Sequence, residues 1–179
     1  SPNVKGVRTE VHCNGWPKED GTLDDADAII LLSDGFGAHP LLKSKERTDK
    51  IDRLMRRGVG LACIHYAVAA DPPVEDKLLR WIGGIYKRGY SKNPINTVKV
   101  SPPKADHPIC RGWKAFTAKD EFYYRIWFGQ GDKSTGRAVP IMTAVLPKGG
   151  KKRQAIAWAV EREDGGRGFG FTGAHFHKN

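Results

Sequence analysis

The chain has 179 residues, of which 39% are hydrophobic and 28% charged, and its formal net charge is +10. This length suits one domain with a sizeable core, and no apolar stretch is long enough to span a membrane. A net positive charge by itself would favour binding to a polyanion such as a nucleic acid. Lys and Arg are scattered among acidic residues, however, and no nucleic-acid-binding motif surrounds them, so we expect no specific nucleic-acid partner.

The first half alternates strand and helix patterns. Residues 4–11 alternate in part and predict a short strand, whereas residues 26–32 form an unbroken apolar run, typical of a parallel strand covered on both faces. Ser44 then predicts a helix N-cap, and Gly58 marks the end of that helix. A second apolar strand is expected over residues 59–64.

A second helix is expected to begin at Asp71, which precedes two prolines, and to end before Gly83. Beyond residue 86 the segments are short and aromatic. We expect strands over residues 120–127, 140–145 and 155–160, partly antiparallel. The strand–helix alternation predicts an α/β fold with a mostly parallel sheet, in which ligands bind at the carboxyl ends of the strands.

Two positions directly follow the expected parallel strands. Asp34 follows the first, and His65 with Tyr66 follows the second at a sharp strand-to-helix junction. A histidine there can act as general acid, general base or metal ligand, although it can also be a cap with a satisfied hydrogen bond. Cys63 lies inside the apolar strand, which favours a small buried side chain over a nucleophile.

His175 and His177 follow a glycine-rich run near the end of the sequence. On a strand they would share one face, with Phe176 on the other, although a polar strand end without function would look the same. Glu121 is the expected acid partner, and Asp120 is a less favoured one. Tyr123 next to it offers an aromatic face and a hydroxyl for a sugar ring, although core packing also explains such aromatics.

Six segments occur in an order that resembles a trehalose-utilisation (ThuA-like) domain: residues 60–68 (GLACIHYAV), 81–84 (WIGG), 89–94 (GYSKNP), 107–109 (HPI), 120–124 (DEFYY) and 165–177 (GGRGFGFTGAHFH). The resemblance implies a class I glutamine-amidotransferase-like fold, which is a flavodoxin-like three-layer sandwich. It also implies that His65 occupies the region of the usual nucleophilic cysteine, and that the domain serves carbohydrate metabolism.

The sequence also departs from that family pattern. It lacks the family's first strand and its glycine loop, and it ends at Asn179 soon after the His-x-His motif. We therefore expect one ThuA-like domain over residues 1–179 that is truncated at both ends, soluble, and located in the cytoplasm or periplasm.

The leading hypothesis is an enzyme-like domain that acts on a disaccharide or keto-sugar. His65, Glu121 and His175 are the expected catalytic residues, with His65 and Glu121 as acid and base and His175 orienting an oxygen. The expected substrate-binding residues are Asp34, Tyr66, Asn93, Tyr123 and His177. No cofactor is expected under this hypothesis.

Two alternatives stay open. The domain is either a non-catalytic carbohydrate-binding module that accompanies a dehydrogenase or a haem-binding protein, or a metal-assisted hydrolase. In the second case a divalent ion would be held by His65, Glu121, His175 and His177, because such N and O ligands suit zinc.

Overall fold

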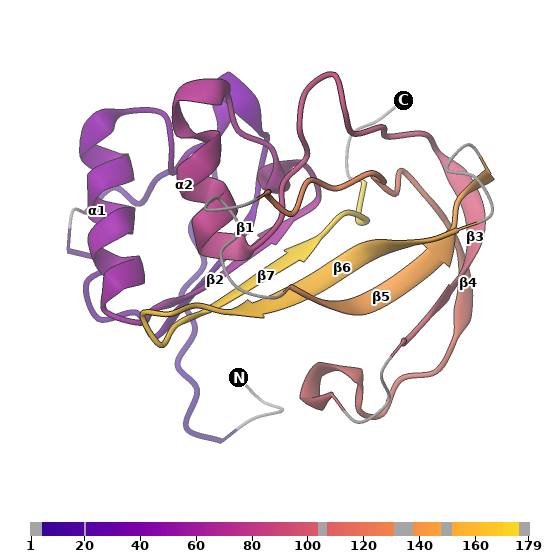
Figure 1. Cartoon of the computed structure of the whole chain (residues 1–179). Coiled ribbons are helices and arrows are strands. Elements are labelled where there is room, and N and C mark those ends of the chain that lie inside the picture. Colours follow the sequence, from indigo (N-terminus) through magenta and orange to yellow (C-terminus); the bar gives the residue numbers. More distant parts are fainter. Residues whose placement is uncertain (1–4, 20, 104–106, 131–137, 148–151, 176–179) are drawn as a thin grey trace.

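The computed structural model of the chain describes residues 5–19, 21–103, 107–130, 138–147 and 152–175. In these ranges seven strands form one sheet with the order β1-β2-β7-β6-β5-β3-β4, and two α-helices lie over its β1–β2–β7 end (Figure 1). No helix within the described ranges is both long and apolar enough to cross a membrane.

The first half folds much as its sequence predicts. It contains β1 (Ala28–Leu32), α1 (Lys45–Arg56), β2 (Gly60–Ile64) and α2 (Pro72–Ile82). The Ser44 hydroxyl accepts a hydrogen bond from the backbone N–H of Arg47 and so caps α1. Gly58 and Gly83 follow the two helices with φ angles of +88° and +77°, a conformation that favours glycine.

The second half supplies β3 (Asn96–Ser101), β4 (Phe116–Asp120), β5 (Val139–Val145), β6 (Arg153–Glu161) and β7 (Arg167–Phe171). Only the pairs β1–β2 and β2–β7 are parallel, whereas β7–β6, β6–β5, β5–β3 and β3–β4 are antiparallel. The fold is therefore α/β, as predicted, but the prediction of a mostly parallel sheet is wrong. Within the described residues a helix joins the neighbouring parallel strands β1 and β2, whereas β5, β6 and β7 follow one another and pair antiparallel.

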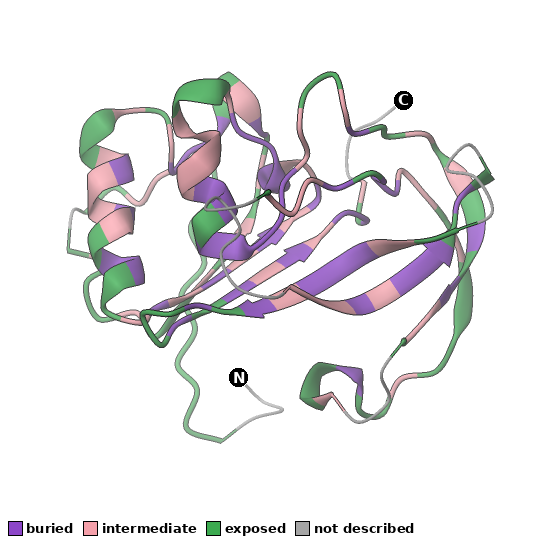
Figure 2. Ribbon diagram, in the orientation of Figure 1, coloured by how far each residue is buried: buried purple, intermediate pink, exposed green. Residues whose placement is uncertain are grey.

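The main core lies between the two helices and the sheet. Ile51 and Met55 of α1, Leu78 and Ile82 of α2, and Leu61 of β2 belong to one buried cluster, and their side of the helices is the buried one in Figure 2. The helices also touch each other, because Trp81 Nε1 donates to Asp52 Oδ1 at 3.3 Å.

The predicted burial of the first apolar run on both faces is wrong. Ile30 and Leu32 of β1 are 76% and 54% exposed. Ile29 and Leu31 pack against the core, and because side chains alternate along a strand, Ile30 and Leu32 lie on the opposite face of the sheet. A three-layer, flavodoxin-like arrangement is therefore not confirmed.

Two predicted strands do not form. Residues 5–11 are exposed and outside any strand, and residue 4 lies outside the described ranges. The strand predicted over residues 120–127 is wrong beyond Asp120, where β4 ends, and only isolated bridges at Tyr124 and Trp127 follow. Aromatic residues favour strands because of the way they pack. Here Phe122 and Tyr124 pack into one cluster and Tyr123 into another without a continuous ladder.

Candidate functional site

His65 lies directly after β2 and begins the short 3-10 helix η2 (His65–Val68). Its φ of +56° is in the left-handed region, which is uncommon for a residue with a side chain and marks a sharp turn. The side chain is fully buried. A second histidine stabilises this turn, because the buried His39 ring donates a hydrogen bond from Nε2 to the carbonyl oxygen of Ala67 at 3.0 Å.

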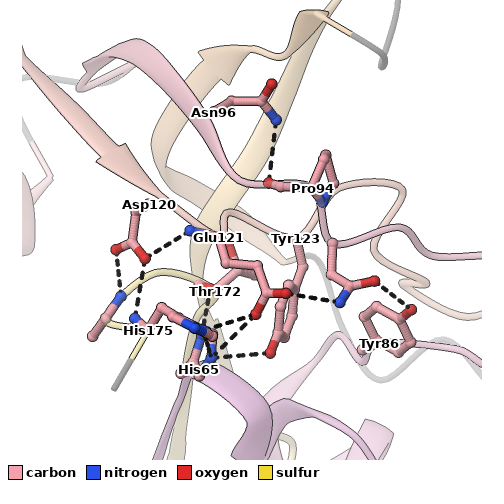
Figure 3. Close-up of polar contacts among 11 residues, drawn as sticks. His65, Tyr86, Pro94, Asn96, Asp120, Glu121, Tyr123, Thr172 and His175 are labelled. Carbon is pink, nitrogen blue, oxygen red and sulfur yellow. Dashed lines mark hydrogen bonds and ion pairs between the residues drawn. The ribbon is translucent and has the colours of Figure 1, made fainter. Parts of the chain in front are cut away.

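The His65 ring is oriented by the chain that follows β7. Nδ1 lies 3.2 Å from the carbonyl oxygen of Thr172, which can only accept, so we assign the ring proton to Nδ1. Nε2 then presents a lone pair toward three groups. The Tyr123 hydroxyl and His175 Nδ1 each lie 3.2 Å from it, and Glu121 Oε2 lies 3.5 Å away (Figure 3).

Glu121 follows β4 and is half-buried. Its Oε1 accepts a hydrogen bond from Asn93 Nδ2 at 2.9 Å, and its Oε2 lies 3.0 Å from His175 Nδ1. The carboxylate therefore contacts both imidazoles of the cluster and is fixed from the other side by an amide (Figure 3).

Asp120 joins the two chain segments that carry Glu121 and His175. Its carboxylate accepts the backbone N–H of Glu121 at 2.7 Å, that of Ala174 at 2.7 Å and that of His175 at 3.0 Å. This residue was the less favoured acid in the sequence. The structure shows it bonded to backbone donors, where it positions the cluster.

His175 reaches the cluster from a loop and not from a strand. β7 ends at Phe171, and Ala174 has a φ of +70°, so the alternation predicted for a strand end does not apply here. His175 meets His65 edge to face, with ring centres 5.1 Å apart. His177 and Phe176 lie outside the described residues, so the prediction for His177 stays untested.

A pocket with a cavity of about 350 Å³ opens beside this cluster. Five of the residues that line it were predicted from the sequence and belong to the expected catalytic or substrate-binding sets, whereas His65 is not among the lining residues. The lining residues are Phe36, Tyr66, Tyr86, Arg88, Asn93, Glu121, Tyr123 and His175.

Three lining residues were missed in the sequence: Phe36, Tyr86 and Arg88. Phe36 lies just past the end of β1, so the rule that singled out Asp34 could have found it. Asp34 itself is exposed and does not line the pocket. Burial raises the pKa of Tyr66, and the Asp34 charge adds to that shift against the opposing charge of Arg88. The aromatic walls meet edge to face, with ring centres 5.5 Å apart for Phe36–Tyr66 and 5.2 Å for Tyr86–Tyr123.

Burial sets the protonation of two groups in the cluster. It lowers the pKa of His65, against the opposing effects of the Thr172 carbonyl and the Glu121 charge, and so favours the neutral ring. Burial, followed by the Glu121 charge, raises the pKa of the Tyr123 hydroxyl, which therefore keeps its proton to donate. Burial also raises the pKa of the Cys63 thiol, which agrees with its predicted place in the core.

The arrangement can both move protons and bind cations. Ligand atoms of His65, Glu121 and His175 all lie within 4.8 Å of one another, and Glu121 and His175 also face the pocket. A carboxylate, an imidazole and a phenol that share one pocket can accept and donate protons on a bound molecule.

The chain is similar to a known protein family and to several solved structures. A family model described as "Trehalose utilisation" (ThuA) matches residues 5–179. No curated protein matches the sequence. Among solved structures, a ThuA-like protein from Parabacteroides merdae is 17% identical with a TM-score of 0.62, and one from Bacteroides uniformis is 18% identical with a TM-score of 0.61.

A cytoplasmic protein from Salmonella typhimurium is 12% identical with a TM-score of 0.58. The alignments cover 84%, 84% and 88% of this chain and 60%, 61% and 64% of the three structures, in the order given. The chain thus spans less than two thirds of the length of these structures. At such identities the likeness shows a shared fold.

Proposed function

The chain belongs to the ThuA trehalose-utilisation family, and from that premise we propose that it binds the ring of a disaccharide or keto-sugar in its pocket and transfers a proton on it. The contact of Glu121, His175 and His65 at 3.0–3.5 Å, at one end of an aromatic pocket, carries this proposal.

The pocket walls suit a sugar ring. Its cavity of about 350 Å³ falls within the range of small-molecule sites, which is about 300–1,000 Å³. The Tyr66, Tyr86 and Tyr123 rings can cover the C–H face of a pyranose, and their hydroxyls can hydrogen-bond its oxygens. The amide of Asn93 and the guanidinium of Arg88 add polar contacts at the rim.

The polar groups favour proton transfer next to a carbonyl over direct hydrolysis of a glycosidic bond. Direct hydrolysis generally uses two carboxylates on either side of the bond. Among the described lining residues only Glu121 is a carboxylate, and Asp120 is bonded to three backbone N–H groups. One base and one acid are enough to remove a proton from the carbon beside a ketone and to protonate its oxygen.

The roles follow from the contacts. Glu121 Oε2 accepts the carbon-bound proton, and the electron pair moves onto the ketone oxygen to give an enediol. His175, whose Nδ1 lies 3.0 Å from Glu121, donates a proton to that oxygen. Neutral His65 is a positioning residue, because its Nε2 contacts both His175 and Tyr123 while its Nδ1–H is fixed on Thr172.

The test is to incubate the protein with a 3-keto-disaccharide in deuterated water and to follow hydrogen exchange at the neighbouring carbons by NMR. Glu121→Gln keeps the shape of the side chain and removes the base, so the exchange rate is expected to fall about 10²–10⁴-fold. His175→Asn should lower it similarly.

Matched controls are Glu163→Gln and His12→Asn, which change the same residue types at exposed positions. Both should exchange like the unchanged protein. If Glu121→Gln exchanges as fast as Glu163→Gln, the proposed chemistry is wrong. Sugar binding without any exchange would instead support the non-catalytic module.

A further inference from the structure

Three side-chain atoms that can serve as metal ligands meet in the cluster around His65. The Nδ1–H of His65 is directed to Thr172, which leaves the Nε2 lone pair facing Glu121 Oε2 at 3.5 Å, and both of these atoms are acceptors. The Tyr123 hydroxyl supplies one proton to Nε2. Two acceptors this close are stabilised when a cation lies between them.

We propose that His65, Glu121 and His175 form a binding site for one divalent transition-metal ion, with Zn²⁺ as the preferred occupant. The ligand atoms would be His65 Nε2, Glu121 Oε2 and His175 Nδ1, whose positions are close together in Figure 3. Two nitrogen ligands favour zinc and its neighbours over Mg²⁺ and Ca²⁺, which prefer oxygen.

The three separations fit a tetrahedral ion. They are 3.0 Å for His175–Glu121, 3.2 Å for His175–His65 and 3.5 Å for His65–Glu121. Zinc bonds of about 2.0–2.1 Å at the tetrahedral angle place neighbouring ligand atoms about 3.3–3.4 Å apart. The three atoms therefore match one face of a zinc tetrahedron without movement of the backbone.

Neighbouring residues hold the proposed ligands by hydrogen bonds, as they do in known metal sites. A metal-bound histidine commonly donates its other ring N–H to a carbonyl oxygen, which is what His65 Nδ1 does with Thr172. Thr172 is itself fixed, because its N–H and its hydroxyl both donate to the Ile156 carbonyl, at 2.9 and 3.1 Å. The second oxygen of Glu121 is occupied by Asn93.

Two of the three ligands line the pocket, so the fourth position of the ion is expected to face it. The role of the ion rests on the proposed function, whereas binding of the ion does not. An ion there would replace the His175 proton as the group that polarises a sugar oxygen. A water molecule on the ion, with a pKa near about 7, would replace Glu121 as the base.

Binding is tested without any sugar. The chelator-treated protein is titrated with ZnCl₂ by calorimetry, and bound zinc is counted by elemental analysis after gel filtration. We expect one zinc per chain, together with weaker binding of Mg²⁺ and Ca²⁺. Addition of Co²⁺ should give the strong visible absorption of a four-coordinate ion.

Glu121→Gln and His175→Asn each remove one ligand and change half-buried side chains, so they should leave the fold intact. Each substitution should weaken zinc affinity by more than roughly 10–100-fold, which is the loss typical when a residue that only hydrogen-bonds a metal ligand is mutated. Glu163→Gln and His107→Asn are the matched controls and should bind like the unchanged protein.

Absence of tight zinc binding by the unchanged protein overturns the site. Zinc affinity that survives in either ligand variant also overturns it, because the ion would then be held elsewhere. Neither result bears on the proposed proton transfer, because hydrogen exchange on the sugar is measured separately in the presence of a chelator. Hydrogen exchange that persists in chelator and depends on Glu121 would keep the metal-free mechanism and remove the catalytic role of the ion.

Discussion

Two buried polar clusters lie at opposite ends of the parallel strands β2 and β7. At the amino end, Arg162 donates to the carbonyls of Val59, Met55, Trp81 and Arg167 at 2.8–3.3 Å and pairs with a carboxylate oxygen of Asp164 at 3.0 Å. An arginine has five N–H donors, and these five contacts use all of them.

The cluster at the carboxyl end differs because two of its side chains, Glu121 and His175, line a pocket. There His65 Nε2 and Glu121 Oε2 are acceptors that face each other, and a pocket opens beside them. Burial of a polar group therefore does not by itself mark a functional site. A polar cluster that is bonded mainly to backbone carbonyls stabilises the fold, whereas a cluster whose acid and imidazole line a pocket can take up a proton, an ion or a substrate.

The largest effect is expected from Arg162→Met. The substitution removes the side-chain donor of four carbonyl groups, three of them in buried bonds, and it leaves Asp164 without its partner, so the free energy of unfolding should fall by about 3–5 kcal/mol. Urea unfolding followed by circular dichroism measures this loss.

Arg167→Met is the matched control, because Arg167 pairs only weakly with Glu161 at 3.6 Å and both side chains are more than 80% exposed. Its effect should stay below about 0.5 kcal/mol. Glu121→Gln, at the other cluster, keeps the shape of a side chain beside the pocket and an oxygen acceptor, so it should cost less than about 1 kcal/mol of stability. Equal losses in the Arg162 and Glu121 variants would contradict the distinction between the two clusters.

A smaller effect is expected from pH, through His39. Burial lowers the pKa of His39 to about 4, despite its hydrogen bond to Ala67. The unfolded chain, with a histidine pKa near about 6.5, then binds more protons than the folded protein between these two values. Stability contributed by neutral His39 is therefore present above pH 6.5 and lost as the pH falls toward 4.

The expected loss between pH 7 and pH 5 is roughly 2 kcal/mol, read from unfolding curves at the two pH values. His39→Gln keeps an N–H donor for Ala67 and does not titrate, so its stability should depend less on pH in this window. A His39→Gln curve as steep as that of the unchanged protein would assign the pH dependence to other groups.

The smallest effect is expected from Asn93→Ala. Asn93 donates one hydrogen bond to Glu121 of the His65 cluster, and it accepts another from the Tyr86 hydroxyl at 3.3 Å. Loss of one such bond at an exposed residue should lower kcat/KM for the keto-sugar about 2–10-fold. Asn96→Ala is the control, because Asn96 donates to Pro94 away from Glu121 (Figure 3) and should leave kcat/KM unchanged.

Local sequence signals predicted the helices well and the sheet only in part. Ser44 and Gly58 bracket α1, and the Asp71–Pro72 start of α2 is where the sequence placed it. The strand β3 was missed although polar and apolar side chains alternate over residues 97–101, which is the pattern of a half-buried strand. The pairing direction of β5 and β6 depends on contacts between distant segments, which no local pattern contains.

For the candidate site, the sequence predicted residues that follow buried strands better than residues that reach the pocket from loops. His65 was found because it follows the apolar run of β2, and it does start a sharp turn. The strand expected around His175 is absent, and yet the loop brings its ring within 3.2 Å of His65. Tyr86 and Arg88 were missed, because nothing in their local sequence shows that they face the same pocket.

The sequence by itself determined the two helices, the positions of strands β1 and β2 and the place of His65 at a strand end, because caps, glycines and apolar runs act over a few residues. The tertiary structure alone decided that Asp120 ties Glu121 and His175 together and that their acceptors meet His65. These contacts join residues that are 54–110 positions apart. Such contacts form only when the folded sheet offsets the entropy of closing so long a loop.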